Sequence, residues 1–312
     1  MGLKFLPRGG CPLCTSQAHV VHMDFAEIPV FRCLDCSFIY SSKIMPAESL
    51  TAYYAKSFGG QRQMQGQLVN ARVNSVLFRR LLNAEESKEN TLLDVGTGYG
   101  FFLDAIRKSH GMRVTGVELS IEEAEFGRKQ LQIDIRNVAL AQAGLEPASY
   151  DIVTAFEVIE HIENPSAFID ELAGYVKPGG LLLIATDNFE STVVRFLGKT
   201  FPKWIPHTHV SHFSPATLAR VIEKNGLNIV KRLSFTPWEF QARKFASKIR
   251  KGDHEHTYSL KDALQAEGSG SYRFFELRRA INSLWARLTA RDNPGGAMMY
   301  FLARKSEKAT NQ

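Results

Sequence analysis

The middle of the chain alternates short apolar runs with segments in which apolar residues recur at helical spacing. The runs lie at residues 91–95, 112–117, 151–156, 181–185, 227–233 and 297–303. Between two of them, Phe168, Ile169 and Leu172 follow the spacing of one helix face. Ser214 and Pro215 suit the start of another helix, since serine caps a helix and proline fits its first turn. The alternation predicts an α/β fold, a doubly wound sheet with helices on both faces.

Segments of different character flank and interrupt this region. Residues 61–82 mix polar and apolar residues at helical spacing, which predicts a helix leading into the sheet region. We divide the chain into a cysteine-bearing ribbon at 1–45, a linker and lead-in helices at 46–90, the α/β core at 91–235 with 295–305, and a helical insertion at 236–294. A short hairpin would be enough to join the last two strands, so an insertion of about 60 residues is a separate feature.

The insertion combines basic and apolar residues. Its basic residues gather at Arg243, Lys244, Lys248, Arg250 and Lys251, and an apolar stripe at helical spacing is formed by Phe274, Leu277, Ile281, Leu284, Trp285 and Leu288. We interpret the second segment as a helix whose stripe packs on the protein while its basic side faces water. Alternatively, the helix lies on an anionic membrane surface or covers a substrate pocket as a lid. The polar residues 253–270 are expected to form a mobile loop.

Composition restricts the class of protein. The 312 residues are 44% hydrophobic and 22% charged, which is ordinary for a globular protein and excludes a wholly disordered chain. Lys and Arg number 38 against 32 Asp and Glu, a mild excess of +6 that permits contact with phosphate or an anionic membrane without requiring either. No apolar run of about 18 residues occurs, and residues 1–10 lack the apolar segment of a secretory signal. We therefore expect a cytoplasmic protein.

All four cysteines fall near the N-terminus, in two CxxC pairs. Cys11 and Cys14 form the first pair, and Cys33 and Cys36 form the second. Two such pairs can direct four thiolates at one point, which is the arrangement of a zinc site. Four thiolates leave no open coordination position, so Zn²⁺ would stabilise a ribbon and not catalyse a reaction. Two disulfides or four idle thiols are the alternatives, but without an export signal we favour zinc.

A glycine-rich turn follows the apolar run at 91–95. The turn is Gly96-Thr97-Gly98-Tyr99-Gly100, and a helical pattern begins directly after it. Glycines let the backbone approach a ligand, and free N–H groups at a helix start can face it. The next apolar run ends in Glu118, where an acid can accept hydrogen bonds from both ribose hydroxyls of an adenosine ligand. An ordinary turn and a solvated strand end are the alternatives, but strand, turn, helix and acid in this order favour adenosine binding.

The same segment resembles a known family. Residues 92–100, Leu-Leu-Asp-Val-Gly-Thr-Gly-Tyr-Gly, are similar to motif I of the class I S-adenosylmethionine-dependent methyltransferases. Residues 150–153, 156–161 and 176–184 resemble later segments of this family, in the same order. The resemblance covers roughly 70–235 and a final strand near 297–304, and the four-Cys ribbon followed by Tyr53-Tyr54 is similar to a bacterial subgroup that acts mostly on small molecules. It implies a seven-stranded Rossmann-like sheet whose last strand is antiparallel.

The resemblance also implies a site for S-adenosyl-L-methionine. The cofactor-binding residues would be Asp94, Gly96, Thr97, Gly98, Gly100, Glu118, Leu119 and Phe156. Asp94 would help to hold the ammonium of the methionine part, Glu118 would take the ribose hydroxyls, and Leu119 would pack on the adenine. The family often has an aspartate after the third strand that accepts from the adenine amino group. This chain has residues 137–142 there, Asn-Val-Ala-Leu-Ala-Gln, so the contact would fall to a backbone carbonyl or to Gln142.

Candidate catalytic residues follow two strand ends, because ligands of open α/β sheets bind at the carboxyl ends of the strands. One cluster is Glu157, Glu160 and His161, and the other is His207, His209 and His212. We expect Glu157, His161, His209 and His212 to be catalytic, with His209 or His161 as the general base. Alternatively, His161 packs at a helix start and the second cluster holds another metal ion. Asp187 and Asn188 are expected on the pocket floor.

These features lead to one hypothesis of function and several competitors. We expect an S-adenosylmethionine-dependent methyltransferase that methylates an oxygen of a small molecule, such as a sugar or another biosynthetic intermediate. An RNA methyltransferase is one alternative, but the basic excess is small and no RNA-reading motif stands out, so nucleic acid is not expected as a partner. A non-catalytic cofactor-binding scaffold is another. A nicotinamide dehydrogenase is disfavoured, because Phe101 stands where the GxGxxG fingerprint has its third glycine.

Overall fold

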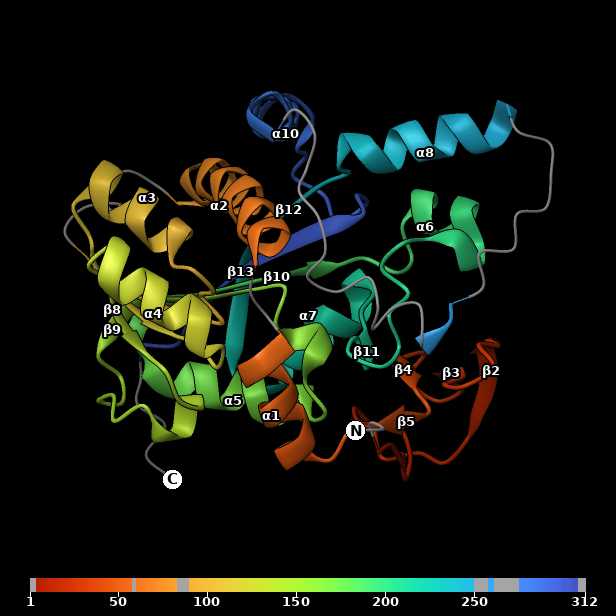
Figure 1. Ribbon diagram of the computed structural model, residues 1–312. Helices are drawn as coiled ribbons and strands as arrows, with labels where there is room; N and C mark the ends of the chain where they lie inside the picture. The colour runs from red at the N-terminus through yellow and green to blue at the C-terminus, as the bar shows by residue number, and fades with distance from the viewer. Residues whose placement is uncertain (1–3, 58–59, 83–89, 250–257, 261–274, 308–312) are drawn as a thin grey trace.

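The computed structural model describes residues 4–57, 60–82, 90–249, 258–260 and 275–307 (Figure 1). Within them, seven strands form the central sheet in the order β12, β13, β10, β9, β6, β7, β8. Their bounds are β6 Thr91–Val95, β7 Arg113–Val117, β8 Asp134–Arg136, β9 Tyr150–Phe156, β10 Val176–Asp187, β12 Leu227–Phe235 and β13 Met298–Lys305. The five neighbouring strands β10, β9, β6, β7 and β8 run parallel. Strand β13 is antiparallel to both β10 and β12. The expected class, strand number and antiparallel last strand are confirmed.

The central strands are buried on both faces, which explains why their sequences are continuous apolar runs and not alternating ones. In β6, Leu92 belongs to the apolar cluster on one side of the sheet and Leu93 to the cluster on the other. Leu183 and Leu182 of β10 divide in the same way. Burial of all four side chains is complete or nearly so.

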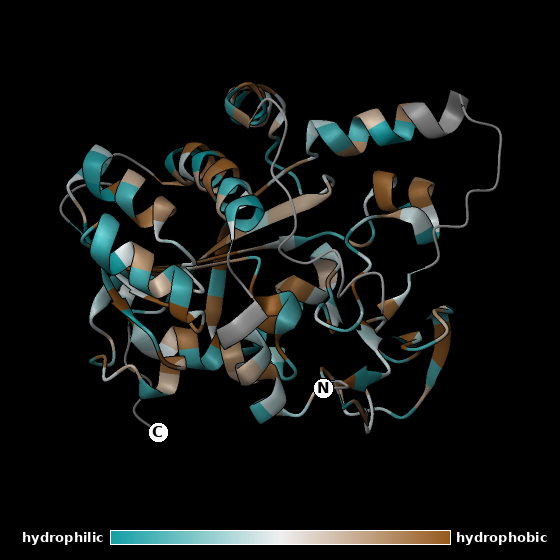
Figure 2. Cartoon of the chain, viewed as in Figure 1, coloured by the Kyte–Doolittle hydropathy of each residue, from teal (hydrophilic) through white to brown (hydrophobic). Residues whose placement is uncertain are grey.

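Helices cover both faces of the sheet. The helices α2 Gln61–Leu81, α3 Phe101–His110, α4 Ile121–Gln130 and α10 Phe275–Thr289 supply the apolar cluster on one face, and α5 Pro165–Tyr175 and α7 Pro215–Lys224 supply that on the other. Figure 2 shows hydrophobic residues along the central strands and hydrophilic residues on the outward sides of the helices. Helix α7 begins as predicted, because the side chains of Ser214 and Thr217 each accept from the other's backbone N–H.

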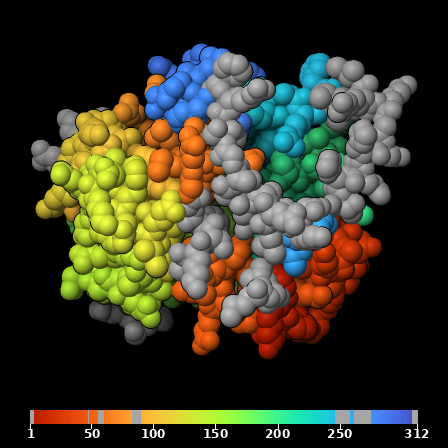
Figure 3. Space-filling model, in the orientation of Figure 1, coloured from red at the N-terminus to blue at the C-terminus, as the bar shows by residue number. Residues whose placement is uncertain are grey.

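The N-terminal ribbon shares β-structure with the core. Strands β2 His19–Met23, β3 Val30–Cys33 and β4 Ile39–Ser41 form an antiparallel sheet, and β1 Leu6–Pro7 pairs with β5 Lys43–Ile44. The fourth strand of the ribbon sheet is β11 Ser211–His212, which comes from the core segment after β10 and pairs with β4. Helix α1 Ala47–Ser57 follows the ribbon, and Figure 3 shows the ribbon in red at the lower right of the molecule.

The helical insertion contains α8 Trp238–Ile249 and α10, and its apolar stripe is not packed as expected. Leu277, Leu284 and Leu288 are 59%, 58% and 72% exposed, and Ile281 is half-exposed. The buried residues of α10 are instead Asn282, Ser283 and Ala286. The packed-stripe interpretation is therefore wrong for the three leucines and Ile281, whereas Trp285 of the stripe packs against the apolar cluster on this face. Helix α2 presents Arg72 to this side, where its Nε donates to Ser283 Oγ at 3.3 Å, so small and polar side chains suit the contact.

Several residues of the insertion lie outside the described part of the chain. They are Phe274, Arg250 and Lys251, together with all but 258–260 of the expected loop at 253–270. Among the residues that the structure describes, none of the helices combines the length and the apolar character needed to cross a bilayer. A short helix, α6 Thr192–Leu197, lies between β10 and the histidine-containing segment and packs against α8.

Candidate functional site

The glycine-rich turn lies between β6 and α3, at the carboxyl edge of the sheet. Gly96, Gly98 and Gly100 have left-handed backbone, with φ of 75°, 58° and 80°. A Cβ at Gly96 would lie 2.4 Å from Val158 Cγ2, and one at Gly98 would lie 2.0 Å from Gln67 Oε1. Both the conformation and the space therefore require glycine. Gly100 is also the N-cap of α3, so the first free N–H groups of this helix lie at the turn.

Glu118 follows β7 and lies beside the turn. Its carboxylate accepts hydrogen bonds from Gly98 N and Ser120 N, both at 2.8 Å. Asn137, directly after β8, donates to the carbonyl oxygens of Glu118 and Leu119 at 2.8 Å and 3.0 Å. Asn137 thereby fixes the backbone that carries the acid and its neighbour Leu119. No spacing in the sequence indicates this role, because an asparagine bonded to carbonyl oxygens leaves no pattern.

Asp94 and Phe156 lie behind the turn. Asp94 is buried, and its Oδ1 accepts from Thr154 Oγ1 at 2.6 Å. Burial raises the pKa of Asp94 to about 7. The ring of Phe156 packs against Phe102 of α3, with centroids 4.7 Å apart. Together these residues place a glycine backbone, the first turn of α3 and an acid at the carboxyl edge of the sheet, and this set fits an adenosyl ligand. The individual binding roles stay predictions.

A group of charged side chains lies at the ends of β9 and β10. Glu157 has a left-handed backbone, with φ 55°, which costs roughly 1–3 kcal/mol and recurs at functional sites. Asn70 Nδ2 donates to Glu157 Oε1 at 3.0 Å and Lys203 Nζ to Oε2 at 2.6 Å. Lys203 Nζ also lies 3.7 Å from Asp187 Oδ2. Although burial favours the neutral amine, the carboxylates of Asp187 and Glu157 raise the pKa of Lys203, and Lys203 holds the pKa of Glu157 below its usual value.

Glu160, His161 and His209 form a neighbouring group. Their ligand atoms lie within 4.8 Å of one another, and the two imidazole rings meet edge to face at 4.6 Å. The hydroxyl of Tyr54, on α1, lies 2.6 Å from His161 Nδ1. Burial lowers the pKa of His161 to about 4 and also lowers that of His209. Both imidazoles are therefore neutral near pH 7.

The structure places the two other histidines of the segment apart from this group. His212 lies in β11, where its ring packs between Phe189 at 4.5 Å and Trp204 at 4.9 Å. His207 Nδ1 lies 2.8 Å from the hydroxyl of Tyr258. Of the histidines expected to be catalytic, His161 and His209 come together and His212 does not join them. Asp187 and Asn188 are both buried, and Asn188 binds the carbonyls of Pro294 and Gly296.

A cavity of about 240 Å³ opens beside the charged group. Helix α2, the ends of β12 and β13, and both helices of the insertion contribute to its walls. Its polar lining includes Asn70, Asn74, Glu157, Lys203, Asn282 and Tyr300. Arg278 of α10 and Glu239 of α8 pair at 3.0 Å along the wall, so the insertion closes one side of the cavity.

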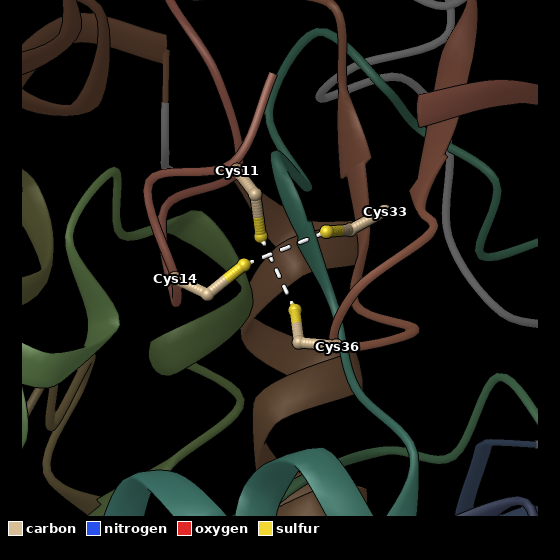
Figure 4. A group of neighbouring side chains, drawn as sticks. All are labelled: Cys11, Cys14, Cys33 and Cys36. Carbon is tan, nitrogen blue, oxygen red and sulfur yellow. Dashed lines mark hydrogen bonds between the residues drawn. The ribbon is translucent and has the colours of Figure 1, made fainter. Parts of the chain in front are cut away.

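The four cysteine sulfurs converge in the ribbon (Figure 4). The sulfurs of Cys11 and Cys36 are 3.4 Å apart, those of Cys14 and Cys33 are 3.5 Å apart, and all four lie within 4.8 Å of one another. A disulfide would require about 2.05 Å, so the cysteines are not paired in this way. The four sulfurs are positioned to bind one metal ion, and a tetrahedral set of thiolates fits Zn²⁺.

Comparison with known proteins agrees with this architecture. Residues 61–232, more than half of the chain, match the family model described as a methyltransferase domain. The ubiquinone biosynthesis O-methyltransferase of Xylella fastidiosa is 31% identical over 167 residues, which cover 49% of this chain and 67% of that protein. The protein of the same name from Idiomarina loihiensis is 31% identical over 160 residues, covering 47% of this chain and 65% of the relative.

Solved structures show the same fold. A S-adenosylmethionine-dependent methyltransferase of Thermotoga maritima, described as a possible histamine N-methyltransferase, has a TM-score of 0.50 at 18% identity and covers 78% of this chain and 91% of its own. A second structure is the complex between the Haloferax volcanii Trm112 methyltransferase activator and the putative methyltransferase. One of its chains matches with a TM-score of 0.51 at 16% identity, and the match covers 82% of this chain and 97% of that chain. At these identities the likeness concerns the fold alone. The family model and the curated relatives decide the assignment: this chain belongs to the family of S-adenosylmethionine-dependent methyltransferases.

Proposed function

We propose that this methyltransferase transfers a methyl group to a hydroxyl oxygen of a small molecule that binds in the cavity beside Glu157. The position of the cavity carries the proposal, because it lies at the carboxyl ends of the central strands, where α/β sheets bind ligands. Its volume of about 240 Å³ is below the roughly 300–1,000 Å³ of pockets for drug-sized ligands, which favours a small acceptor. The relatives named as O-methyltransferases favour oxygen as the acceptor atom.

The donor would bind at the glycine turn. S-adenosyl-L-methionine supplies a methyl group on a positively charged sulfur, which becomes neutral when the methyl group leaves. Glu118 would accept from the ribose hydroxyls, and Asp94 would help to hold the ammonium group. Gly96, Thr97, Gly98, Gly100, Leu119 and Phe156 would complete the site. The two backbone amides that bind Glu118 support its role, since they hold the carboxylate at a fixed place beside the turn.

A hydroxyl acceptor must lose its proton as its oxygen forms a bond to the methyl carbon. We assign this step to His161 and His209, whose imidazoles are neutral near pH 7. Tyr54 would orient His161 through its contact with Nδ1. Glu157, kept ionised by Lys203, would orient the acceptor at the mouth of the cavity. We assign no catalytic step to His212, because Phe189 and Trp204 enclose it.

We also propose a division of roles along the chain. The ribbon at 1–45 would hold a structural Zn²⁺, the helices within 46–90 would lead into the core, and 91–235 with 295–305 would carry the donor site. The insertion at 236–294 would be a lid over the acceptor, since α8 and α10 line the cavity. Four thiolates require a reducing environment, which favours the cytoplasm as the location.

A labelling experiment tests the proposed function. The purified protein is incubated with S-adenosyl-L-methionine carrying a labelled methyl group, once with the small-molecule fraction and once with the RNA fraction of a bacterial extract. We expect label in the small-molecule fraction, in a product that resists mild alkali, because a methyl ether is stable there and a methyl ester is not. The variant Glu157→Gln should lose the label and keep its affinity for S-adenosylhomocysteine.

Two results would contradict this proposal. Label found in RNA alone would favour the RNA methyltransferase. Absence of label in every fraction, from a protein that binds S-adenosylhomocysteine, would favour a non-catalytic scaffold.

A further inference from the structure

Three potential metal ligands meet between the end of β9 and the segment before β11. The carboxylate of Glu160 and the imidazoles of His161 and His209 have ligand atoms within 4.8 Å of one another. Glu160 is fully buried and His209 is 6% exposed, whereas His161 is half-buried. The protein interior therefore encloses Glu160 and His209, and His161 is the partly exposed member of the group.

Hydrogen-bond contacts orient Glu160 and His161, and each of the three side chains keeps an atom for a ligand. Glu160 Oε2 accepts from Thr186 Oγ1 at 2.8 Å, while Oε1 has no hydrogen-bond partner among the described residues. His161 Nδ1 is engaged by the hydroxyl of Tyr54 and lies near Thr208 O, so Nε2 is the nitrogen left for a metal. His209 Nδ1 is buried and likewise has no partner in the described chain. Buried polar atoms of this kind are costly unless something binds them.

The charges around the group are unbalanced. Glu157, Glu160 and Asp187 have carboxylate oxygens within 4.8 Å of one another, and Lys203 Nζ lies 2.6 Å from Glu157 Oε2 and 3.7 Å from Asp187 Oδ2. Among the described residues, three carboxyl groups therefore face one ammonium, and a divalent cation beside Glu160 would balance the excess of acidic groups.

We propose that Glu160, His161 and His209 bind a divalent first-row transition-metal ion, separate from the metal of the cysteine ribbon. Two neutral imidazoles and one carboxylate are a ligand set of such ions, and three protein ligands leave coordination positions open. Asp187, with both oxygens free of hydrogen bonds, lies close enough to Glu160 to orient a metal-bound water. The cysteine set differs in kind, because four thiolates leave no open position.

The site deepens the proposed function, on which its catalytic part rests. A hydroxyl acceptor bound at an open position of the ion would have a lowered pKa. Its O–H bond would break with the proton passing to water, its oxygen would bond to the methyl carbon, and the carbon–sulfur bond would break with its electron pair remaining on sulfur. His161 and His209 would then act as ligands and not as free bases.

Titration with Mn²⁺ tests the site without donor or acceptor. Mn²⁺ is chosen because thiolates bind it poorly, so the ribbon of the intact protein does not compete. Calorimetry measures binding directly, and the electron paramagnetic resonance signal of free Mn²⁺ gives the bound amount by difference. Both should show one bound ion per chain. Glu160→Gln and His209→Ala should each weaken binding by at least about tenfold, since even the loss of an outer-shell partner costs 10–100-fold.

Glu123→Gln is the matched control. Glu123 is also a buried glutamate whose pKa is raised to about 8 by burial, but it pairs with Gln67 on α2 and lies outside the group. We expect its Mn²⁺ affinity to equal that of the unmodified protein. Thermal unfolding of each variant reports whether it is folded. If Glu160→Gln does not fold, the Mn²⁺ affinity of His209→Ala tests the site.

The proposal is overturned if the unmodified protein binds no Mn²⁺, or if both ligand variants bind it as tightly as Glu123→Gln does. A protein that binds Mn²⁺ at this site yet methylates nothing would refute the proposed function and leave the metal site standing. Methylation of a hydroxyl at an unchanged rate by Glu160→Gln would refute the catalytic role of the ion.

Discussion

Glu118 is the residue that we propose to bind the ribose of the donor. Its carboxylate is fixed by two backbone amides beside the glycine turn, so it is already oriented when a ribose arrives. We expect Glu118→Ala to weaken binding of S-adenosylhomocysteine by about 1–3 kcal/mol, or about five- to 150-fold, because hydrogen bonds to a charged acceptor are lost. Isothermal titration calorimetry measures this change.

A control for this substitution is Glu125→Ala. Glu125 lies on α4 near Glu118 in sequence, but its side chain is 45% exposed and pairs with Lys129. Donor affinity should stay the same in this variant. Equal affinity of Glu118→Ala and the unmodified protein would exclude Glu118 as the ribose acceptor.

Glu160 should make stability depend on pH. Burial comes first among the causes that raise its pKa from 4.5 to about 8, followed by the charges of Asp187 and Glu157. Above pH 4.5 the unfolded chain loses this proton while the folded chain keeps it. Glu160 therefore costs the folded state increasing free energy as the pH rises from 4.5 to about 8.

Glu160→Gln removes this dependence because its side chain does not titrate. Relative to the unmodified protein, the free energy of unfolding of the variant should rise over the same pH range, with a slope of up to about 1.4 kcal/mol per pH unit. Urea unfolding at several pH values, without added divalent cation, measures the difference. A difference that does not change with pH would show that Glu160 keeps an ordinary pKa in the folded protein.

At the scale of elements, α10 shows how a helix can turn its apolar stripe outward. Leu284 is 58% exposed, while Ala286 is fully buried against the cluster that includes α2. Leu284→Ser should therefore change the free energy of unfolding by less than about 0.5 kcal/mol, as exposed substitutions do. Ala286→Leu should cost about 1–3 kcal/mol, because the added side chain overfills the contact. Urea unfolding of both variants tests the orientation, and the opposite ranking would contradict it.

The strand β11 connects the ribbon to the histidine-containing segment. Ser41 N donates to Val210 O at 3.0 Å, Ser41 Oγ lies 3.2 Å from His209 O, and Arg8 Nη1 donates to Val210 O at 2.8 Å. The backbone at His209 is thus held by residues of the ribbon. Strand β3 ends at Cys33 and pairs with β4, and β4 pairs with β11, so a metal ion bound by the cysteines would support this arrangement.

For the whole molecule, the ribbon and the core should unfold together. Cys11, Cys33 and Cys36 belong to the same apolar cluster as Leu93 and Leu182 of the central sheet. Removal of the ribbon metal with a chelator should therefore lower the temperature of a single unfolding transition, by roughly 2–4 °C for each kcal/mol lost. Calorimetry follows the transition, and hydrogen exchange should show faster exchange at β11 than at β6. A separate early transition of the ribbon would contradict this coupling.

The sequence alone was enough to predict the succession of strands along the chain, the glycine turn with Glu118, and the convergence of the four cysteines. These features depend on short spacings, such as two CxxC pairs, or on apolar runs that any doubly wound sheet buries on both faces. The sequence also marked Glu157, His161 and His209 as candidates, because they follow strand ends. It did not indicate Lys203, which stands alone among apolar residues at 201–206 and has no patterned partner.

Only the tertiary structure decided which of these residues meet. It brings His209 to Glu160 and His161, leaves His212 between Phe189 and Trp204, adds β11 to the ribbon sheet, and turns the apolar stripe of α10 to solvent. The physical reason is that such contacts join residues far apart in the chain. Their free energy depends on the neighbour that packing supplies, and local spacing carries no information about that neighbour.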